Sequence, residues 1–113
     1  MFSRRKTCTI PPEWLDQVSE ILGRGEDDEI EWTTDAFQGW HLYGTRQDAY
    51  AAMLRCLVPG ARGKFVKMRI DEGPTYAFFF HARGKQMYGK ICLIGSEKKL
   101  IIYSAHEPEW EAL

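Results

Sequence analysis

Residues 64–106 read KFVKMRIDEGPTYAFFFHARGKQMYGKICLIGSEKKLIIYSAH, and this stretch decides the expected fold. Runs rich in Val, Ile, Phe and Tyr alternate with short segments that contain Gly, Pro, Ser or Asp, as strands and turns do. The runs are Lys64–Asp71, Thr75–Arg83, Met87–Ile94 and Lys98–Ala105. Because short turns join neighbouring antiparallel strands, the stretch predicts a four-stranded antiparallel meander.

Tight turns at residues 84–85 and 96–97 predict which residues of the last three strands lie opposite one another. Lys90 is then expected between Phe79 and Tyr103, on one face of the sheet. Side chains alternate between the two faces of a strand, so a hydrophobic set is expected on the other face. This expected core consists of Phe78, Phe80, Ile91, Leu93, Leu100 and Ile102.

The first strand of the meander depends on the length of the loop that follows it. A three-residue loop at 72–74 places Phe65, Lys67 and Arg69 on the same face as Lys90. Val66, Met68 and Ile70 then belong to the core, which suits their hydrophobicity. A loop of two or four residues would invert the strand.

Two helices are expected before the meander. The first follows Pro11 and Pro12, which are tolerated at a helix entry, and ends near Gly23 or Gly25. The second starts at Thr45 with a capping pattern and stops before Pro59-Gly60. Their apolar stripes are Trp14, Val18, Ile21 and Leu22 in the first, and Tyr50, Met53, Leu54 and Leu57 in the second. The prediction is one α+β domain over residues 1–113, with two helices packed on one face of the four-stranded meander.

The segment between the helices begins with the acidic run Glu26–Glu31 and continues with mixed aromatic and polar residues. We expect a loop with one or two short strands, at Ile30–Thr33 and Trp40–Leu42. The aromatic residues Trp32, Phe37 and Trp40 either roof the core, which is the commoner fate of large aromatics, or mark an interface if they are exposed together.

The composition, at 44% hydrophobic and 13% aromatic residues, predicts an ordered soluble chain. No apolar run approaches the roughly 20 residues of a membrane helix, and no signal peptide is recognisable, so we expect no membrane partner and a cytoplasmic location. The cysteines (Cys8, Cys56 and Cys92) and histidines (His41, His81 and His106) are isolated. Their spacing matches neither a disulfide framework nor a metal site, and no cofactor is expected.

The net charge of −1 conceals a strong segregation. Residues 1–53 carry five Lys/Arg and ten Asp/Glu, residues 54–99 carry ten and three, and residues 100–113 carry none and three. The meander is therefore strongly basic within a nearly neutral chain. It can attract an anionic partner, or it can simply be neutralised by the acidic run.

The open face of the predicted sheet combines basic and aromatic side chains. Its members are Lys67, Arg69, Phe79, His81, Arg83, Tyr88, Lys90 and Tyr103. Cations can neutralise phosphates while aromatic rings stack on unpaired bases, so single-stranded RNA is the preferred ligand. An acidic protein surface is an alternative partner, and a solubilising face without a ligand is another alternative.

Helices followed by a basic antiparallel meander resemble, in element order over about half the chain, the small ribonuclease toxins of the RelE and barnase-like group. The resemblance implies cleavage of RNA through the ribose 2′-hydroxyl. His81 or His106 would then exchange protons, Lys90 with Arg69 or Arg83 would stabilise phosphate charge, and Tyr88 or Tyr103 would position a base. The near-neutral charge departs from that typically basic group.

A further class of function is non-enzymatic: a protein-interaction or inhibitor protein that uses the acidic run and the Trp-rich segment. A homodimer is also compatible with the pattern, because Phe65 and Ile101 are expected on the outer sheet face. A small-ligand cavity between helices and sheet is another alternative, although ordinary core packing is commoner. Its expected lining is Trp14, Tyr50, Met53 and Phe80.

Overall fold

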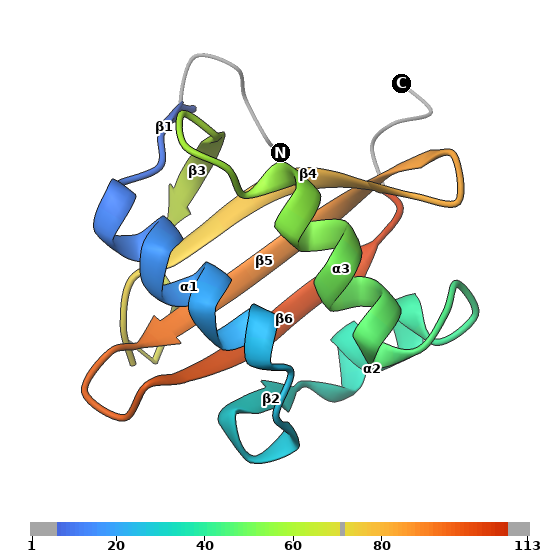
Figure 1. Cartoon of the computed structure of the whole chain (residues 1–113), viewed down its shortest axis with the longest axis horizontal. Helices are drawn as coiled ribbons and strands as arrows, with labels where there is room; N and C mark the ends of the chain where they lie inside the picture. Colours follow the sequence, from blue (N-terminus) through green and yellow to red (C-terminus); the bar gives the residue numbers. More distant parts are fainter. Residues whose placement is uncertain (1–6, 71, 109–113) are drawn as a thin grey trace.

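The computed structural model describes residues 7–70 and 72–108 of the chain. Three α-helices, one 3₁₀-helix and six strands follow one another within these residues (Figure 1). In chain order they are β1 (Cys8–Thr9), α1 (Pro12–Arg24), η2 (Asp27–Glu29), β2 (Ile30–Trp32), α2 (Thr34–Trp40), α3 (Arg46–Cys56), β3 (Arg62–Val66), β4 (Thr75–Ala82), β5 (Lys85–Ile94) and β6 (Lys99–His106).

The strands form one mixed sheet in the order β1-β3-β4-β5-β6-β2. All neighbours are antiparallel except β2 and β6, which run parallel. Helices α1 and α3 cross the same face of the sheet (Figure 1). The predicted α+β class is therefore confirmed. The details differ from the predicted four-stranded meander with two helices and one or two extra short strands, because the sheet has six strands and is mixed, and there is a third α-helix. The short strands β1 and β2 extend the meander at its two edges, and α2 is an additional helix.

The two predicted helices begin and end at the residues that the sequence marks as helix limits. Pro12 opens α1, and Gly25 ends it in the left-handed conformation with φ 62°, its N–H bonded to the Ile21 carbonyl. Thr45 caps α3 through a reciprocal pair of hydrogen bonds with Asp48. Local sequence chemistry therefore suffices to place both helices.

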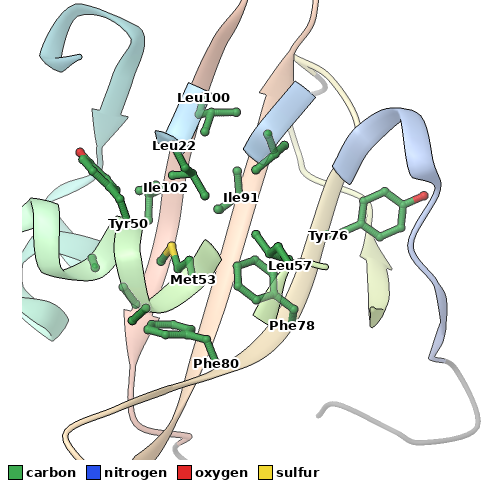
Figure 2. Close-up of a cluster of buried hydrophobic side chains, with 14 of the residues drawn as sticks. Leu22, Tyr50, Met53, Leu57, Tyr76, Phe78, Phe80, Ile91, Leu100 and Ile102 are labelled. Carbon is green, nitrogen blue, oxygen red and sulfur yellow. The ribbon is translucent and has the colours of Figure 1, made fainter. Parts of the chain in front are cut away.

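The core lies between the sheet and the helices α1 and α3. Figure 2 shows side chains from β4, β5 and β6 pointing toward those of both helices. All six residues expected in the sheet's half of the core are buried. The four residues considered as a cavity lining, Trp14, Tyr50, Met53 and Phe80, are packed in the same core cluster.

The β4–β5 turn differs from the predicted one. Its central residues are Arg83 and Gly84, both with positive φ (56° and 72°), as a two-residue hairpin of the primed type requires. Phe79 consequently pairs with Tyr88, and Lys90 pairs with Ala77, so the predicted Phe79–Lys90 pairing is wrong. Each residue of β4 therefore pairs with a β5 residue two positions away from the predicted one. Because side chains alternate along a strand with a period of two, every residue keeps its predicted face.

The β5–β6 pairing follows the predicted register from the turn as far as Ile91 opposite Ile102. There a β-bulge intervenes, and Lys90 pairs with Ser104 instead of Tyr103. Tyr103 is the extra residue of the bulge. The predicted placement of Lys90 directly between two aromatic rings is therefore wrong on both sides.

The first strand of the meander is inverted relative to the prediction. Lys64 pairs with Ala77 and Phe65 with Tyr76, which turns Phe65 toward the helix side. The strand ends at Val66, and residues 67–74 form a connection of eight residues rather than three. Ile70, expected in the core, lies on this connection with 72% of its surface exposed.

The segment between α1 and α3 contains the predicted strand near Ile30, but the strand expected at Trp40–Leu42 is wrong, because Trp40 is the last residue of α2. Trp40 is 2% exposed, so it belongs to the core, as the roof interpretation predicted. Trp32 is half-buried and donates its indole N–H to the Tyr50 hydroxyl. Phe37 alone of the three aromatics is largely exposed, which leaves no exposed cluster of these rings.

Candidate anion-binding site

The sheet face opposite α1 and α3 is called the outer face below. Five of the eight predicted site residues stand on its strands: Phe79 and His81 on β4, Tyr88 and Lys90 on β5, and Tyr103 on β6. The face assignment follows from the Phe79–Tyr88 and Ala77–Lys90 pairs and from strand alternation, which places the core residues Phe78, Phe80 and Ile91 on the other face.

The other three predicted site residues lie off the outer face. Lys67 and Arg69 are exposed on the connection between β3 and β4. Arg83 stands in the hairpin turn, where its Nε donates a hydrogen bond of 2.8 Å to the Tyr43 carbonyl. Their predicted grouping with Lys90 is therefore wrong, because the strand and turn boundaries differ from the expected ones.

A pocket of about 650 Å³ opens where the outer face meets α2, and we call it the Lys90 pocket. It lies within the range of volumes typical of small-ligand sites. Its lining residues are Thr33, Asp35, Gly39, Lys90, Tyr103, Ser104, His106 and Glu107. Lys90 and Tyr103 were predicted site residues, and His106 was a predicted proton carrier.

The wall of the pocket exists because the segment from β2 to α2 crosses the edge of β6. Thr33 donates its backbone N–H to the Ile102 carbonyl and its hydroxyl to the Tyr103 carbonyl, across 70 residues of sequence in the second case. Gly39 permits the close approach: a Cβ there would lie 2.9 Å from the His106 Cβ and 3.2 Å from the Ala105 carbonyl oxygen. The absence of a side chain at Gly39 therefore brings α2 against the end of β6.

Lys90 is the central cation of the pocket. Its side chain is half-buried, and this burial lowers the pKa of its ammonium group below the usual value. Within the described part of the chain, the Lys90 ammonium group has neither a carboxylate within 4.0 Å nor a hydrogen bond. A partly desolvated cation without an anionic partner favours the binding of an external anion.

Aromatic rings continue from the pocket along the outer face. The ring of Tyr88 lies 5.5 Å from the His106 ring and 6.3 Å from the ring of Phe79, measured between centroids. Burial raises the pKa of Tyr88, and burial together with Glu72 raises that of Tyr103, so both hydroxyls are neutral at pH 7. The rings of His106, Tyr88 and Phe79, which we call the aromatic row, offer flat surfaces beside Lys90.

His106 is held by the backbone that follows it. Its Nδ1 lies 2.7 Å from the Glu107 carbonyl oxygen. A carbonyl can only accept, so Nδ1 carries the proton and Nε2 of the neutral ring keeps a lone pair. The Glu107 carboxylate accepts a hydrogen bond from the Tyr43 hydroxyl, which is the main cause of its lowered pKa, and lies 3.6 Å from the Lys85 Nζ.

Two carboxylates of the acidic run form ion pairs away from the Lys90 pocket. Glu29 pairs with Arg24 at 3.0 Å, and Asp27 lies 3.8 Å from Arg46. Both arginines belong to helices, so the described ion pairs do not neutralise Lys90 with the acidic run. Six of the twelve residues that line a second pocket, of about 610 Å³, are acidic. They are Asp27, Asp28, Glu29, Glu31, Glu72 and Glu97.

No family model matches the chain, and the searches of the curated proteins and of the solved structures returned no match. In the part of the chain that the structure describes, no helix is long and apolar enough to span a membrane. Among the same residues, no three His, Cys, Asp or Glu side chains converge in a way that could hold a metal ion. The chemistry of the Lys90 pocket is therefore the basis for a functional proposal.

The sequence interpretation missed the residues that α2 contributes, Thr33, Asp35 and Gly39, and also Ser104 and Glu107. The sequence held no clear signal for this set. The segment around Gly39 was expected to be a loop with short strands, because it mixes aromatic and polar residues, and nothing in it names β6 as a packing partner.

Proposed function

We propose that the outer face binds single-stranded RNA, with one phosphate at Lys90. The observation that carries the proposal is the half-buried ammonium group of Lys90, which lines a pocket and has no anionic partner among the described residues. A phosphate would supply the missing charge and thereby raise the pKa of Lys90 again.

The aromatic row supports a nucleic acid over a simple anion. Bases of a single strand can stack on aromatic side chains, and each such contact contributes about 1–3 kcal/mol to binding. Tyr88 and Phe79 continue outward from His106, which itself lines the pocket. An RNA strand with one phosphate at Lys90 could therefore stack its neighbouring bases on the aromatic row.

Lys90→Ala should weaken the binding of a labelled mixed-sequence RNA by about tenfold, because a desolvated charge-assisted contact is lost. The affinities are to be measured by fluorescence anisotropy between about 50 and 200 mM salt, and should fall steeply as salt rises. Arg55→Ala is the matched control, since it removes an equal charge from exposed α3 on the opposite side of the sheet. It should change the affinity less than about twofold.

Thermal unfolding of the Lys90→Ala variant should match that of the parent protein, and Lys90→Arg should retain most of the affinity. Equal losses in the Lys90→Ala and Arg55→Ala variants would contradict a site at Lys90. No binding at the lowest salt would reject RNA and favour the protein-interaction function instead.

RNA cleavage is a second candidate, and the position of His106 favours it. The lone pair on Nε2 could accept the proton of a ribose 2′-hydroxyl as its oxygen attacks the adjacent phosphorus. The bond from phosphorus to the 5′-oxygen would break, leaving a 2′,3′-cyclic phosphate and a 5′-hydroxyl that takes its proton from water. Lys90 would stabilise the charge on the phosphate oxygens.

His106→Ala should abolish cleavage of the labelled RNA, by about 10²-fold or more, while the RNA remains bound. Electrophoresis of the incubated RNA and identification of its new ends test this outcome. His81→Ala is the control, because His81 pairs with Gln86 toward the hairpin turn and does not line the pocket. An intact RNA after incubation with the parent protein would leave binding as the function.

A further inference from the structure

The Lys90 pocket is lined by more hydrogen-bond acceptors than a pure anion site requires. Ser104 is only 8% exposed, yet it lines the pocket and makes no hydrogen bond through its side chain to another described residue. Asp35 also lines the pocket, and its carboxylate has neither an ion pair nor a hydrogen bond within the described residues. A hydroxyl and a carboxylate are therefore available beside the lysine.

The pocket holds a cation and carboxylates that are not ion-paired with one another. Among the described residues, no carboxylate lies within 4.0 Å of the Lys90 ammonium nitrogen. The Glu107 carboxylate is occupied by Tyr43 and Lys85, which leaves Asp35 as the available acceptor. A ligand that is anionic throughout would be repelled by Asp35, whereas one that places a hydroxyl donor next to an anion suits both groups.

The ribose of RNA has this combination, because its 2′-hydroxyl stands beside the 3′-phosphate. The hydroxyl can donate to a carboxylate and accept from a serine, and it is the group by which a protein distinguishes RNA from DNA. The pocket, at about 650 Å³, has a volume suited to one nucleotide.

We propose that the Lys90 pocket holds one ribonucleotide of the bound strand, with its phosphate at Lys90 and its 2′-hydroxyl at Asp35 and Ser104, and so selects RNA over DNA. This inference rests on the proposed RNA-binding function, because it assigns the substrate class of the same site. It does not rest on the cleavage candidate, in which the 2′-hydroxyl proton passes to His106 instead.

Three labelled oligonucleotides of one base sequence test the inference: RNA, DNA and 2′-O-methyl RNA. The protein should bind the RNA about tenfold more tightly than the other two, since neither of them can donate a hydrogen bond from the 2′ position. Asp35→Ala should reduce this preference to about threefold or less. It should also leave the affinity for DNA unchanged or slightly higher, because a negative charge is removed from the pocket.

Asp16→Ala, an exposed acidic position on α1, is the matched control and should leave the RNA preference unchanged. Equal affinity of the parent protein for RNA and DNA would overturn the inference while leaving nucleic-acid binding at Lys90 intact. A preference that persists in full in the Asp35→Ala variant would overturn the role of Asp35. No binding of any of the three oligonucleotides would instead reject the proposed function itself.

Discussion

Trp40→Ala should lower the free energy of unfolding by about 3–5 kcal/mol. The indole is 2% exposed and packs against the rings of Phe80 and Tyr43, with centroid distances of 6.1 and 5.8 Å. Its Nε1 donates a hydrogen bond of 2.7 Å to the Thr45 carbonyl. Alanine would leave a void and remove that donor, and both effects destabilise the folded state.

Urea denaturation monitored by far-UV circular dichroism measures this loss. Phe37→Ala is the matched control, because Phe37 lies on the same helix but is 43% exposed and should cost only about 1 kcal/mol or less. Because Trp40 anchors the helix that forms one wall of the Lys90 pocket, the Trp40 variant should also bind RNA more weakly while still folded. Similar stability losses in the two variants would contradict the burial assigned to Trp40.

Phe80→Ala should destabilise the protein by about 3–5 kcal/mol, whereas Phe79→Ala should cost about 1 kcal/mol. Phe80 is completely buried between the sheet and the helices (Figure 2), while Phe79 is half-buried on the outer face with its ring near Tyr88. The two residues are adjacent and identical in type, so the difference measures which face of the sheet is the core.

The same urea titration compares the two phenylalanine variants under equal conditions. A larger loss for Phe79→Ala would mean that the two sheet faces are reversed. In that case the Lys90 pocket could not lie on the exposed side, because Lys90 and Phe79 share a face.

The face assignment of β4, β5 and β6 as far as Tyr103 was predictable because it depends on alternation alone. After the bulge the alternation shifts by one residue, so that Ala105 is buried in the core and His106 pairs with Tyr88. The true β4–β5 turn at residues 83–84 changes every pairing from the predicted one, yet Phe78 and Phe80 remain in the core. A shift by two positions preserves the side on which each residue lies. The faces of the first strand were predicted wrongly. The connection after Val66 has eight residues and the predicted loop had three, and the resulting shift in pairing is an odd number of positions, which exchanges the two faces.

The candidate site was predictable only in part. Lys90, Tyr88 and Tyr103 could be recognised as a basic and aromatic group on one face, because strand periodicity collects them there. The bulge that pairs Lys90 with Ser104 could not be recognised, since a single extra residue in a strand has no periodic signature.

By itself, the sequence determined the α+β class, the limits of α1 and α3, and the two faces of β4, β5 and β6 as far as its bulge, because capping residues and side-chain periodicity act over a few residues. Only the tertiary structure decided the pocket. Its wall depends on a parallel pairing of β2 with β6 and on the contact of Gly39 with His106, between segments about 70 residues apart. Such contacts form where the packing of the whole chain places two surfaces together, and local residue patterns do not specify which surfaces will meet.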